Sequence, residues 1–301
     1  MVKVLGYSRY IAAYVLGPPQ RGLVHSSFAS AANLVFAADF FLSLNAEPGT
    51  LLACSDLLHR SISPEPRTAL PLLPNGVLLS VSENMFPFGA LKAGMAVMLG
   101  AGRLWLEPLA CSLDLSTCSR WDSRIEQADG LRTALFKEHV HWLQHLGDQP
   151  PPVGIAALEI PEDQPILTLA RSICGRGVGL TPGGDDFLLG WLAAGWLLYG
   201  PQPDFLALGR SIVEIAEQRT HALSRYWLAC AAHGHVAQPV RALLAALTRP
   251  EQQQLEQAAS NLLAMGATSG SDTLRGILYA IKQAPLYSLS TLRLEARDSS
   301  Y

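Results

Sequence analysis

A change in the spacing of apolar residues near Trp121 divides this chain into two parts. From Gly22 to about Cys111 the apolar residues come in short runs broken by Gly, Pro, Asn and Ser, which is typical of strands joined by turns. Beyond Trp121 they recur at helical intervals among charged residues. We therefore expect an α+β protein, with an N-terminal β-rich barrel or sandwich domain followed by a mainly helical C-terminal domain.

The domain boundaries follow from this change. We expect a β-rich domain over residues 1–120 that begins with a short helix within residues 1–17, a helical domain over 121–285, and a tail over 286–301. A hairpin turn is expected at Ala101 and Gly102, between two strands. Helices are expected over 124–146, 166–174, 186–199, 205–232, 239–247, 250–265 and 272–283.

Charge and composition limit the classes of partner that this chain can have. The formal net charge of −3 and the pI near 6.2, with no run of Lys or Arg, disfavour a nucleic-acid partner. The longest apolar run, 187–199, is shorter than the ~20 residues that cross a bilayer, so no membrane partner is expected. Five scattered cysteines without a C-x-x-C pair indicate a reducing compartment. We expect a cytoplasmic protein that acts on small molecules or other proteins.

The pattern G-x-T-x-G-x-D occurs twice, at Gly179–Asp185 and at Gly266–Asp272, and each copy leads into an apolar helical stretch. A glycine turn that opens a helix concentrates free backbone N–H groups and a positive dipole end, which together hold anions. The first copy is neither a Walker A loop nor a dinucleotide fingerprint. If the two loops meet, a site lies between two helix N-termini, and Arg176 is the nearest cation.

The carboxylates in these loops allow several interpretations. Asp185 and Asp272 can serve as N-cap or first-turn residues, each contributing about 0.5–2 kcal/mol to helix stability. Alternatively, they and Asp186 hold Mg²⁺, or accept hydrogen bonds from ligand N–H groups while backbone N–H groups take the ligand's oxygens. The cofactor is left open, with Mg²⁺ as the candidate.

Three other groups of residues are weaker candidates. Thr220 and Ser224 form a polar i, i+4 stripe on an apolar helix, either at a helix contact or as one wall of a pocket. His25 lies in a polar cluster without an acid partner at an informative spacing. Glu138, His141 and His145 share one helical face and permit a metal site, but a solvated face is the favoured interpretation.

The loops, together with the segment 22–28 and the Thr220/Ser224 helix, resemble a bacterial family long labelled a domain of unknown function. The resemblance spans most of residues 20–283. Members of that family include the AllH-type subunit of oxamate carbamoyltransferase, an allantoin-catabolism enzyme built from three kinds of subunit. Two positions depart from the family pattern, Gly183, where serine is common, and Ser271, where a bulky residue is frequent.

The resemblance implies a subunit of a complex that moves a carbamoyl group between oxalurate and phosphate. The implied partners are the other subunits and a small anionic or ureido substrate, and no bound metal is assigned. The alternatives are a stand-alone Mg²⁺-assisted hydrolase or phosphotransferase, and a non-catalytic scaffold or regulatory subunit. The implied catalytic residues are Asp185, Asp186 and Asp272, and the implied substrate-binding residues are His25, Arg176, Gly179, Thr181, Gly183, Gly184, Thr220, Ser224, Thr268, Ser269, Gly270 and Ser271.

Overall fold

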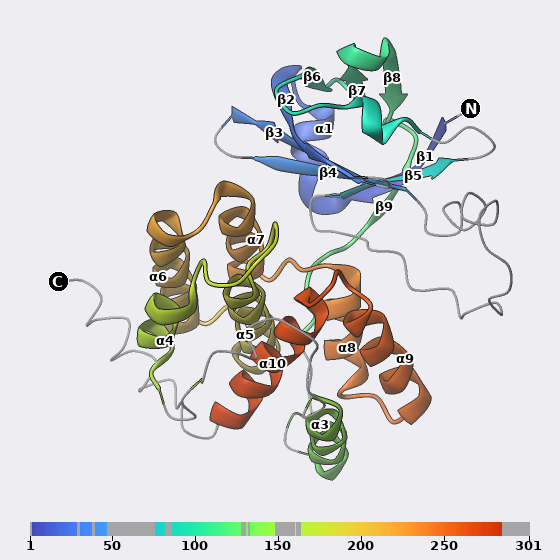
Figure 1. Cartoon of the computed structure of the whole chain (residues 1–301). Helices are drawn as coiled ribbons and strands as arrows, with labels where there is room; N and C mark the ends of the chain where they lie inside the picture. The colour runs from blue at the N-terminus through green and yellow to red at the C-terminus, as the bar shows by residue number, and fades with distance from the viewer. Residues whose placement is uncertain are drawn as a thin grey trace, which may run out of the picture. The chain divides into compact units, whose positions relative to one another are not determined.

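The computed structural model describes residues 2–28, 31–37, 40–46, 76–81, 86–127, 131, 133–147, 160 and 164–284. The chain divides into two compact units, Met1–Ser123 and Arg124–Tyr301. Figure 1 shows a curled sheet in the first unit and a set of packed helices in the second. The expected α+β class, with a β-rich part followed by a helical part, is confirmed. The expected tail over 286–301 lies outside the described residues.

The strands of the first unit form one nine-stranded sheet in the order β8-β7-β6-β2-β3-β4-β5-β1-β9. Neighbouring strands are antiparallel except for the pairs β4·β5 and β1·β9, which are parallel. The sheet curls enough to bring β1 near β8 at the other end of the order. The strand bounds are β1 Val2–Ser8, β2 Gln20–Ser27, β3 Ala31–Phe36, β4 Phe41–Ala46, β5 Gly76–Val81, β6 Ala96–Gly100, β7 Arg103–Leu106, β8 Cys111–Asp114 and β9 Ser119–Trp121.

The core of this unit is built from the buried residues of the strands. Burial alternates along part of β2, where Val24 is 1% exposed and Leu23 beside it is 48% exposed, as expected of a strand with one face in water. In β4, by contrast, the consecutive residues Phe41, Leu42, Ser43 and Leu44 are all buried, so this strand is covered on both faces. The curled sheet therefore encloses its own apolar core.

The short helix expected within residues 1–17 is present, but it does not begin the chain. Val2–Ser8 forms strand β1, and helix α1 is confined to Ala12–Leu16. The backbone of β1 is hydrogen-bonded to β5 on one side and to β9 on the other. These ladders to distant segments outweigh the local helical pattern, because they satisfy the strand's backbone donors and acceptors.

The hairpin expected at Ala101 and Gly102 is confirmed. These residues connect β6 to β7, with Gly100 opposite Arg103. Ala101 has φ 49° and Gly102 has φ 74°. Positive φ at both central residues is the geometry that matches the twist of two paired strands.

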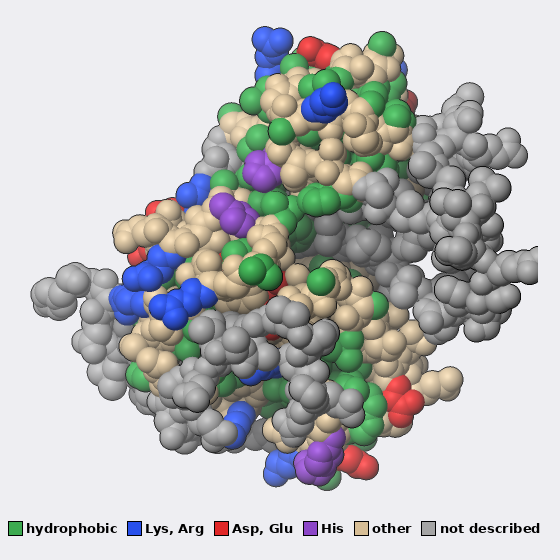
Figure 2. All heavy atoms as spheres, viewed as in Figure 1, with side chains coloured by type: hydrophobic (Ala, Val, Ile, Leu, Met, Phe, Trp, Pro, Cys, Tyr) green, Lys and Arg blue, Asp and Glu red, His purple; other side chains and the backbone are tan. Residues whose placement is uncertain are grey.

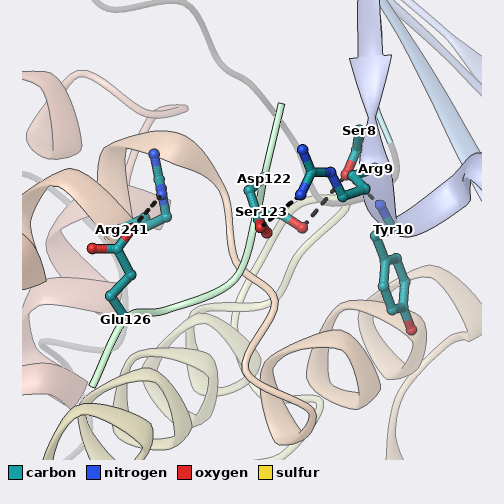
Figure 3. A network of polar contacts seen from close by, with 7 residues as sticks. All are labelled: Ser8, Arg9, Tyr10, Asp122, Ser123, Glu126 and Arg241. Carbon is teal, nitrogen blue, oxygen red and sulfur yellow. Dashed lines mark hydrogen bonds and ion pairs between the residues drawn. The ribbon is translucent and has the colours of Figure 1, made fainter. Parts of the chain in front are cut away.

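Polar contacts join the beginning of the first unit to its end (Figure 3). The Ser8 hydroxyl donates to the Ser123 hydroxyl at 3.4 Å, and Arg9 lies 3.9 Å from the Asp122 carboxylate. The ion pair is largely exposed, so it contributes little to stability. Figure 3 also draws an ion pair of the second unit, Arg241 with Glu126 at 3.7 Å.

The helices of the second unit have the bounds α3 Ala134–Gly147, α4 Ile166–Ile173, α5 Gly183–Tyr199, α6 Pro203–Arg219, α7 Ala222–Ala232, α8 Gln238–Ala246, α9 Gln252–Leu263 and α10 Ser269–Gln283. Helix α5 lies at the centre of this unit and packs against α4, α6, α7, α8 and, most extensively, α10. Nearly every residue of α5 is buried. A helix that is apolar all round belongs in a protein core or a membrane. Among the described residues no helix is long and apolar enough to traverse a bilayer.

One expected helix is wrong in a way that affects the candidate site. The continuous helix expected over 205–232 is two helices, α6 and α7, separated by Thr220 and His221 in extended conformation. Thr220 ends α6 and Ser224 lies in the first turn of α7, so they do not form an i, i+4 stripe on one helix. The break has a tertiary cause, because the carbonyl of Arg219 lies against Gly175 and the Thr220 hydroxyl bonds to Asp185.

Candidate functional site at the N-termini of α5 and α10

The helices that follow the two glycine loops pack against each other through their backbones. A Cβ added to Gly190 of α5 would lie 2.0 Å from the Thr273 carbonyl oxygen of α10, and one added to Gly276 of α10 would lie 2.0 Å from the Phe187 carbonyl oxygen of α5. The two contacts are reciprocal. Only glycine allows this approach, so the two helix N-termini are held in a fixed relation.

This packing corrects the register of the repeat. The sequence pattern pairs Gly183 with Gly270 and Asp185 with Asp272. In the structure α5 begins at Gly183 and α10 at Ser269, so the equivalent of Asp272 is Asp186. The two N-caps are Pro182 and Thr268. The register differs because the first loop has one more residue than the second between its leading glycine and the start of its helix.

The two loops meet through hydroxyl groups. The Oγ1 atom of Thr181 lies 3.1 Å from the Oγ atom of Ser269. Both hydroxyls also hydrogen-bond to the carboxyl group of Asp186. Residues from the two copies therefore converge at the carboxyl group of one first-turn aspartate.

Asp186 is held in a strongly perturbed environment. It is 6% exposed, and its Oδ2 atom has no hydrogen-bond partner among the described residues. Burial raises the pKa of its carboxyl group to about 7, the hydrogen bonds from Ser269 and Thr181 lower it, and the nearby charge of Asp272 raises it. Asp272 itself is fully buried. Near neutral pH, Asp186 is thus divided between its protonated and ionised forms.

Asp185 has a different environment, although it is adjacent in sequence. Its Oδ1 atom accepts from the Gly175 backbone N–H at 2.8 Å and from the Cys174 thiol at 3.3 Å, and its Oδ2 atom accepts from the Thr220 hydroxyl. These contacts reach the chain before the loop and the α6–α7 break, and no N-cap residue is involved. Burial, and then the neighbouring Asp185, raise the pKa of the Cys174 thiol, so this cysteine stays protonated and unreactive. Asp185 therefore fastens the first loop in place.

Two of the loop amides expected to be available to a ligand are already used. The N–H of Gly184 donates to the Arg176 carbonyl at 2.9 Å, and the N–H of Gly270 donates to the Met265 carbonyl at 3.0 Å. A Cβ at Gly184 or Gly270 would lie 1.9 Å from a carbonyl oxygen of the preceding helix. The glycines at these two positions are therefore explained by close packing of the helix start against the preceding segment.

The outer part of the first loop faces solvent. Arg176, Gly177, Val178 and Gly179 are exposed, Val178 to 75%. Gly177 and Gly179 have φ of 118° and 102°, which L side chains rarely adopt. The candidate cation Arg176 is thus accessible to a small molecule at the edge of the site.

The remaining predicted residues of the second unit lie around these contacts. In the second loop the Ser271 hydroxyl donates to the Thr268 carbonyl at 2.7 Å, which ties that turn together locally. Ser224 is 1% exposed, and its hydroxyl oxygen has no hydrogen-bond partner among the described residues. The ring Nδ1 of His221 accepts weakly from the Ser224 backbone N–H at 3.4 Å.

His25 belongs to the first unit, in a chain of polar side chains across β2, β3 and β4. Its Nδ1 atom lies 3.2 Å from the Ser26 hydroxyl, Asn33 donates to Ser26 at 3.0 Å, and Ser43 donates to Asn33 at 2.7 Å. The His25 ring also makes a T-shaped contact with Phe41, with ring centroids 5.2 Å apart. A role for His25 in binding substrate stays a prediction.

The magnesium interpretation requires several carboxylates arranged around one ion. In the part of the chain that the structure describes, no three His, Cys, Asp or Glu side chains are grouped to hold a metal ion together. The oxygens of Asp185 are bonded to protein donors, as described above. The residues present thus do not form a three-carboxylate cage.

The second unit also has a groove that was not predicted from the sequence. A groove of ≈ 580 Å³ lies between the segment 125–127 and helices α8 and α9. Side-chain amides and two arginines line much of it, including Gln127, Gln238, Arg241, Arg249, Gln257 and Asn261. Gln254, Gln257 and Asn261 recur at i, i+3 and i+7, and this one-sided polar stripe on α9 is the signal that could have indicated the groove.

Comparison with known families concerns the second unit. Residues 173–281 match the family model described as oxamate carbamoyltransferase subunit AllH. The matched segment begins at the end of α4, ends within α10 and contains both glycine loops. No solved structure matches the chain. The resemblance to the AllH family found from sequence motifs is thus confirmed over this segment.

Proposed function

We propose that this chain is a subunit of an oxamate carbamoyltransferase complex, which transfers a carbamoyl group between oxalurate and phosphate in allantoin catabolism. The observation that carries the proposal is the match of residues 173–281 to the AllH family model. The partners are the other subunits of that complex, and the ligand is a small ureido or anionic compound. The convergence of the two loops at Asp186 supports a substrate site within the matched segment.

The donors and acceptors of the loop region suit such a substrate. A ureido group presents several N–H donors, and the carboxyl group of Asp186 is an acceptor for them. The fully buried Asp272 acts through its charge on Asp186. The exposed guanidinium of Arg176 can pair with a carboxylate or phosphate through two parallel hydrogen bonds. In this arrangement side chains bind both ends of the ligand, and the amides of Gly184 and Gly270 keep their structural bonds.

Phosphorolysis of oxalurate also needs a proton donor. A phosphate oxygen attacks the carbamoyl carbon, the C–N bond breaks, and the nitrogen that leaves with oxamate takes up a proton. Asp186, whose pKa is raised to about 7 by burial, carries that proton in part of the molecules at neutral pH. In the reverse direction its carboxylate removes a proton from oxamate nitrogen as the carbamoyl group transfers. We assign Asp186 as the acid–base residue and Asp185 as a positioning residue.

The test uses the reconstituted complex and measures carbamoyl phosphate formed from oxalurate and phosphate. Asp186→Asn is expected to lower turnover by about 10²–10⁴-fold, because general acid–base catalysis typically contributes that much. The loss of rate above about pH 7 should also disappear in the variant, since the titrating proton donor is gone. Glu256→Gln, at an exposed position of α9, is the matched control and should leave turnover unchanged.

Two outcomes would contradict the proposal at different levels. A complex that lacks this chain and still forms carbamoyl phosphate at the full rate would reject the subunit assignment. Unchanged turnover of Asp186→Asn within an active complex would reject the acid–base role and leave the subunit assignment standing.

A further inference from the structure

Two histidines on α3 form a pair away from the loops. His141 and His145 are exposed, and their Nε2 atoms lie 3.1 Å apart. Their ring centroids are 4.4 Å apart, with the ring planes at 71°. Figure 2 shows histidine side chains at the surface in the region of α3, at the bottom of the view. Neither residue belongs to the proposed reaction site.

The separation of the two nitrogens fits shared binding of one ion. Two bare lone pairs at this distance would repel each other, so either a proton or a metal ion belongs between them. Imidazole nitrogen binds Zn²⁺ at about 2.0–2.1 Å. Two ligands at that distance, with an angle of about 90–110° at the metal, lie roughly 2.9–3.4 Å apart. The observed 3.1 Å falls in this interval, so neither ring has to move far to bind an ion.

The helix beneath the pair is firmly anchored. The opposite face of α3 buries Phe136, Val140 and Leu143. His139, which is 2% exposed, has its Nδ1 atom 3.2 Å from the Leu247 carbonyl oxygen. The i, i+4 spacing then places His141 and His145 on one solvent-facing row. Ligands on a rigid element lose little conformational entropy when they bind an ion.

We propose that His141 and His145 form a two-ligand surface site for a late first-row transition-metal ion such as Zn²⁺, Ni²⁺ or Cu²⁺. Imidazole suits these ions, whereas Mg²⁺ and Ca²⁺ prefer oxygen ligands. No third His, Cys, Asp or Glu joins the pair among the residues that the structure describes, so water completes the coordination. Glu138, the third residue of the face predicted from sequence, is exposed one turn earlier and is not part of such a group.

The experiment is calorimetric titration of the full-length chain, without a histidine tag, with Zn²⁺ and separately with Mg²⁺. We expect one Zn²⁺ ion per chain and no heat with Mg²⁺. His141→Ala and His145→Ala should each weaken Zn²⁺ binding by at least about tenfold, because each removes half of the protein ligands. The matched control is His233→Ala at an exposed histidine that ends α7, and it should bind as the wild type does.

Electron paramagnetic resonance of bound Cu²⁺ gives a second readout. Two equivalent nitrogens should couple to the ion in the wild type, and one or none in each single variant. Circular dichroism checks that both variants keep the helix content of the wild type. Wild-type protein that binds no Zn²⁺, or His141→Ala and His145→Ala variants that bind it unchanged, would overturn the proposal.

Discussion

The N-termini of α5 and α10 carry the same interlocking positions but differ in how their loops are held. Gly184, Asp186 and Gly190 of α5 correspond to Gly270, Asp272 and Gly276 of α10, and the glycines make the same close backbone approaches. The equivalent of Asp185 is Ser271, which bonds only within its own turn in the contacts described above. The shared glycines allow the helices to pack closely, and the shared aspartates place two buried carboxyl groups together. The position that differs, Asp185 in the first copy, holds the first loop in place.

The first loop also approaches its helix by a longer route. It passes through Gly175, Gly177 and Gly179, all with positive φ, and Asp185 ties it to the α6–α7 break. The second loop follows directly from α9. The first copy therefore has contacts beyond the helix pair that both copies share.

The largest expected effect concerns the shared carboxyl pair. Asp186 has a pKa raised from 3.8 to about 7, so it binds its proton more tightly in the folded protein. The stability that this proton contributes is present below about pH 4 and is lost as the pH rises toward 7. Asp186→Asn should remove this loss, so its free energy of unfolding should exceed that of the wild type by on the order of 4 kcal/mol at about pH 8, with little gain at about pH 4. Urea unfolding across this pH range measures it, and a gain that does not depend on pH would contradict the assignment.

The second-largest effect is expected at Gly190 and Gly276, the glycines through which α5 and α10 contact each other. Gly190→Ala and Gly276→Ala each place a Cβ about 2 Å from a carbonyl oxygen of the partner helix, which neither backbone can avoid. Each should lower the free energy of unfolding by about 3 kcal/mol, at the upper end of typical overpacking costs. Gly89→Ala is the control, because nothing lies within 4 Å of its added Cβ. Unequal losses of unfolding free energy at Gly190 and Gly276 would mean that the two positions are not equivalent.

A smaller difference in stability is expected between substitutions at the equivalent positions Asp185 and Ser271. Asp185→Asn weakens charge-assisted bonds to the Gly175 N–H and the Thr220 hydroxyl, and we expect it to cost about 2 kcal/mol. Ser271→Ala removes one neutral bond and should cost about 0.5–1 kcal/mol. Thermal unfolding of both variants measures the difference. Equal costs would mean that the first loop is held no more firmly than the second.

The smallest effect is expected where the loops touch. Thr181→Val and Ser269→Ala, made singly and together, should show a coupling energy of about 0.5–1 kcal/mol in a double-mutant cycle. Each single variant should also raise the pKa of Asp186, since both hydroxyls lower it. Carboxyl carbon chemical shifts recorded against pH measure this change. Strict additivity, with an unmoved Asp186 titration, would mean that the loops do not communicate through these hydroxyls.

Much of the fold follows from local sequence patterns. The hairpin at Ala101–Gly102 lies where turn chemistry predicts it, and α5 and α10 end at the predicted Tyr199 and Gln283. The first strand and the break at Thr220 did not follow. Both depend on partners far along the chain, β5 and β9 in one case and Gly175 with Asp185 in the other.

The sequence predicted that the two loops form the candidate site, but it did not predict which positions of the two copies are equivalent. Matching identical letters pairs Asp185 with Asp272, whereas helix packing pairs Asp186 with Asp272. Sequence identity records which residues recur, but close backbone contacts decide which positions are equivalent, and these depend on where each helix begins. Which of three neighbouring aspartates is fully bonded and which is left to titrate is likewise a property of the assembled structure.

The glycine contacts between α5 and α10 also have a mechanical consequence. Where main chain rests directly on main chain, no flexible side chain lies between the helices to absorb a displacement. A ligand that pulls on the first loop should therefore shift the second in step, so that the two helix N-termini move as one rigid body and the spacing between them stays the same.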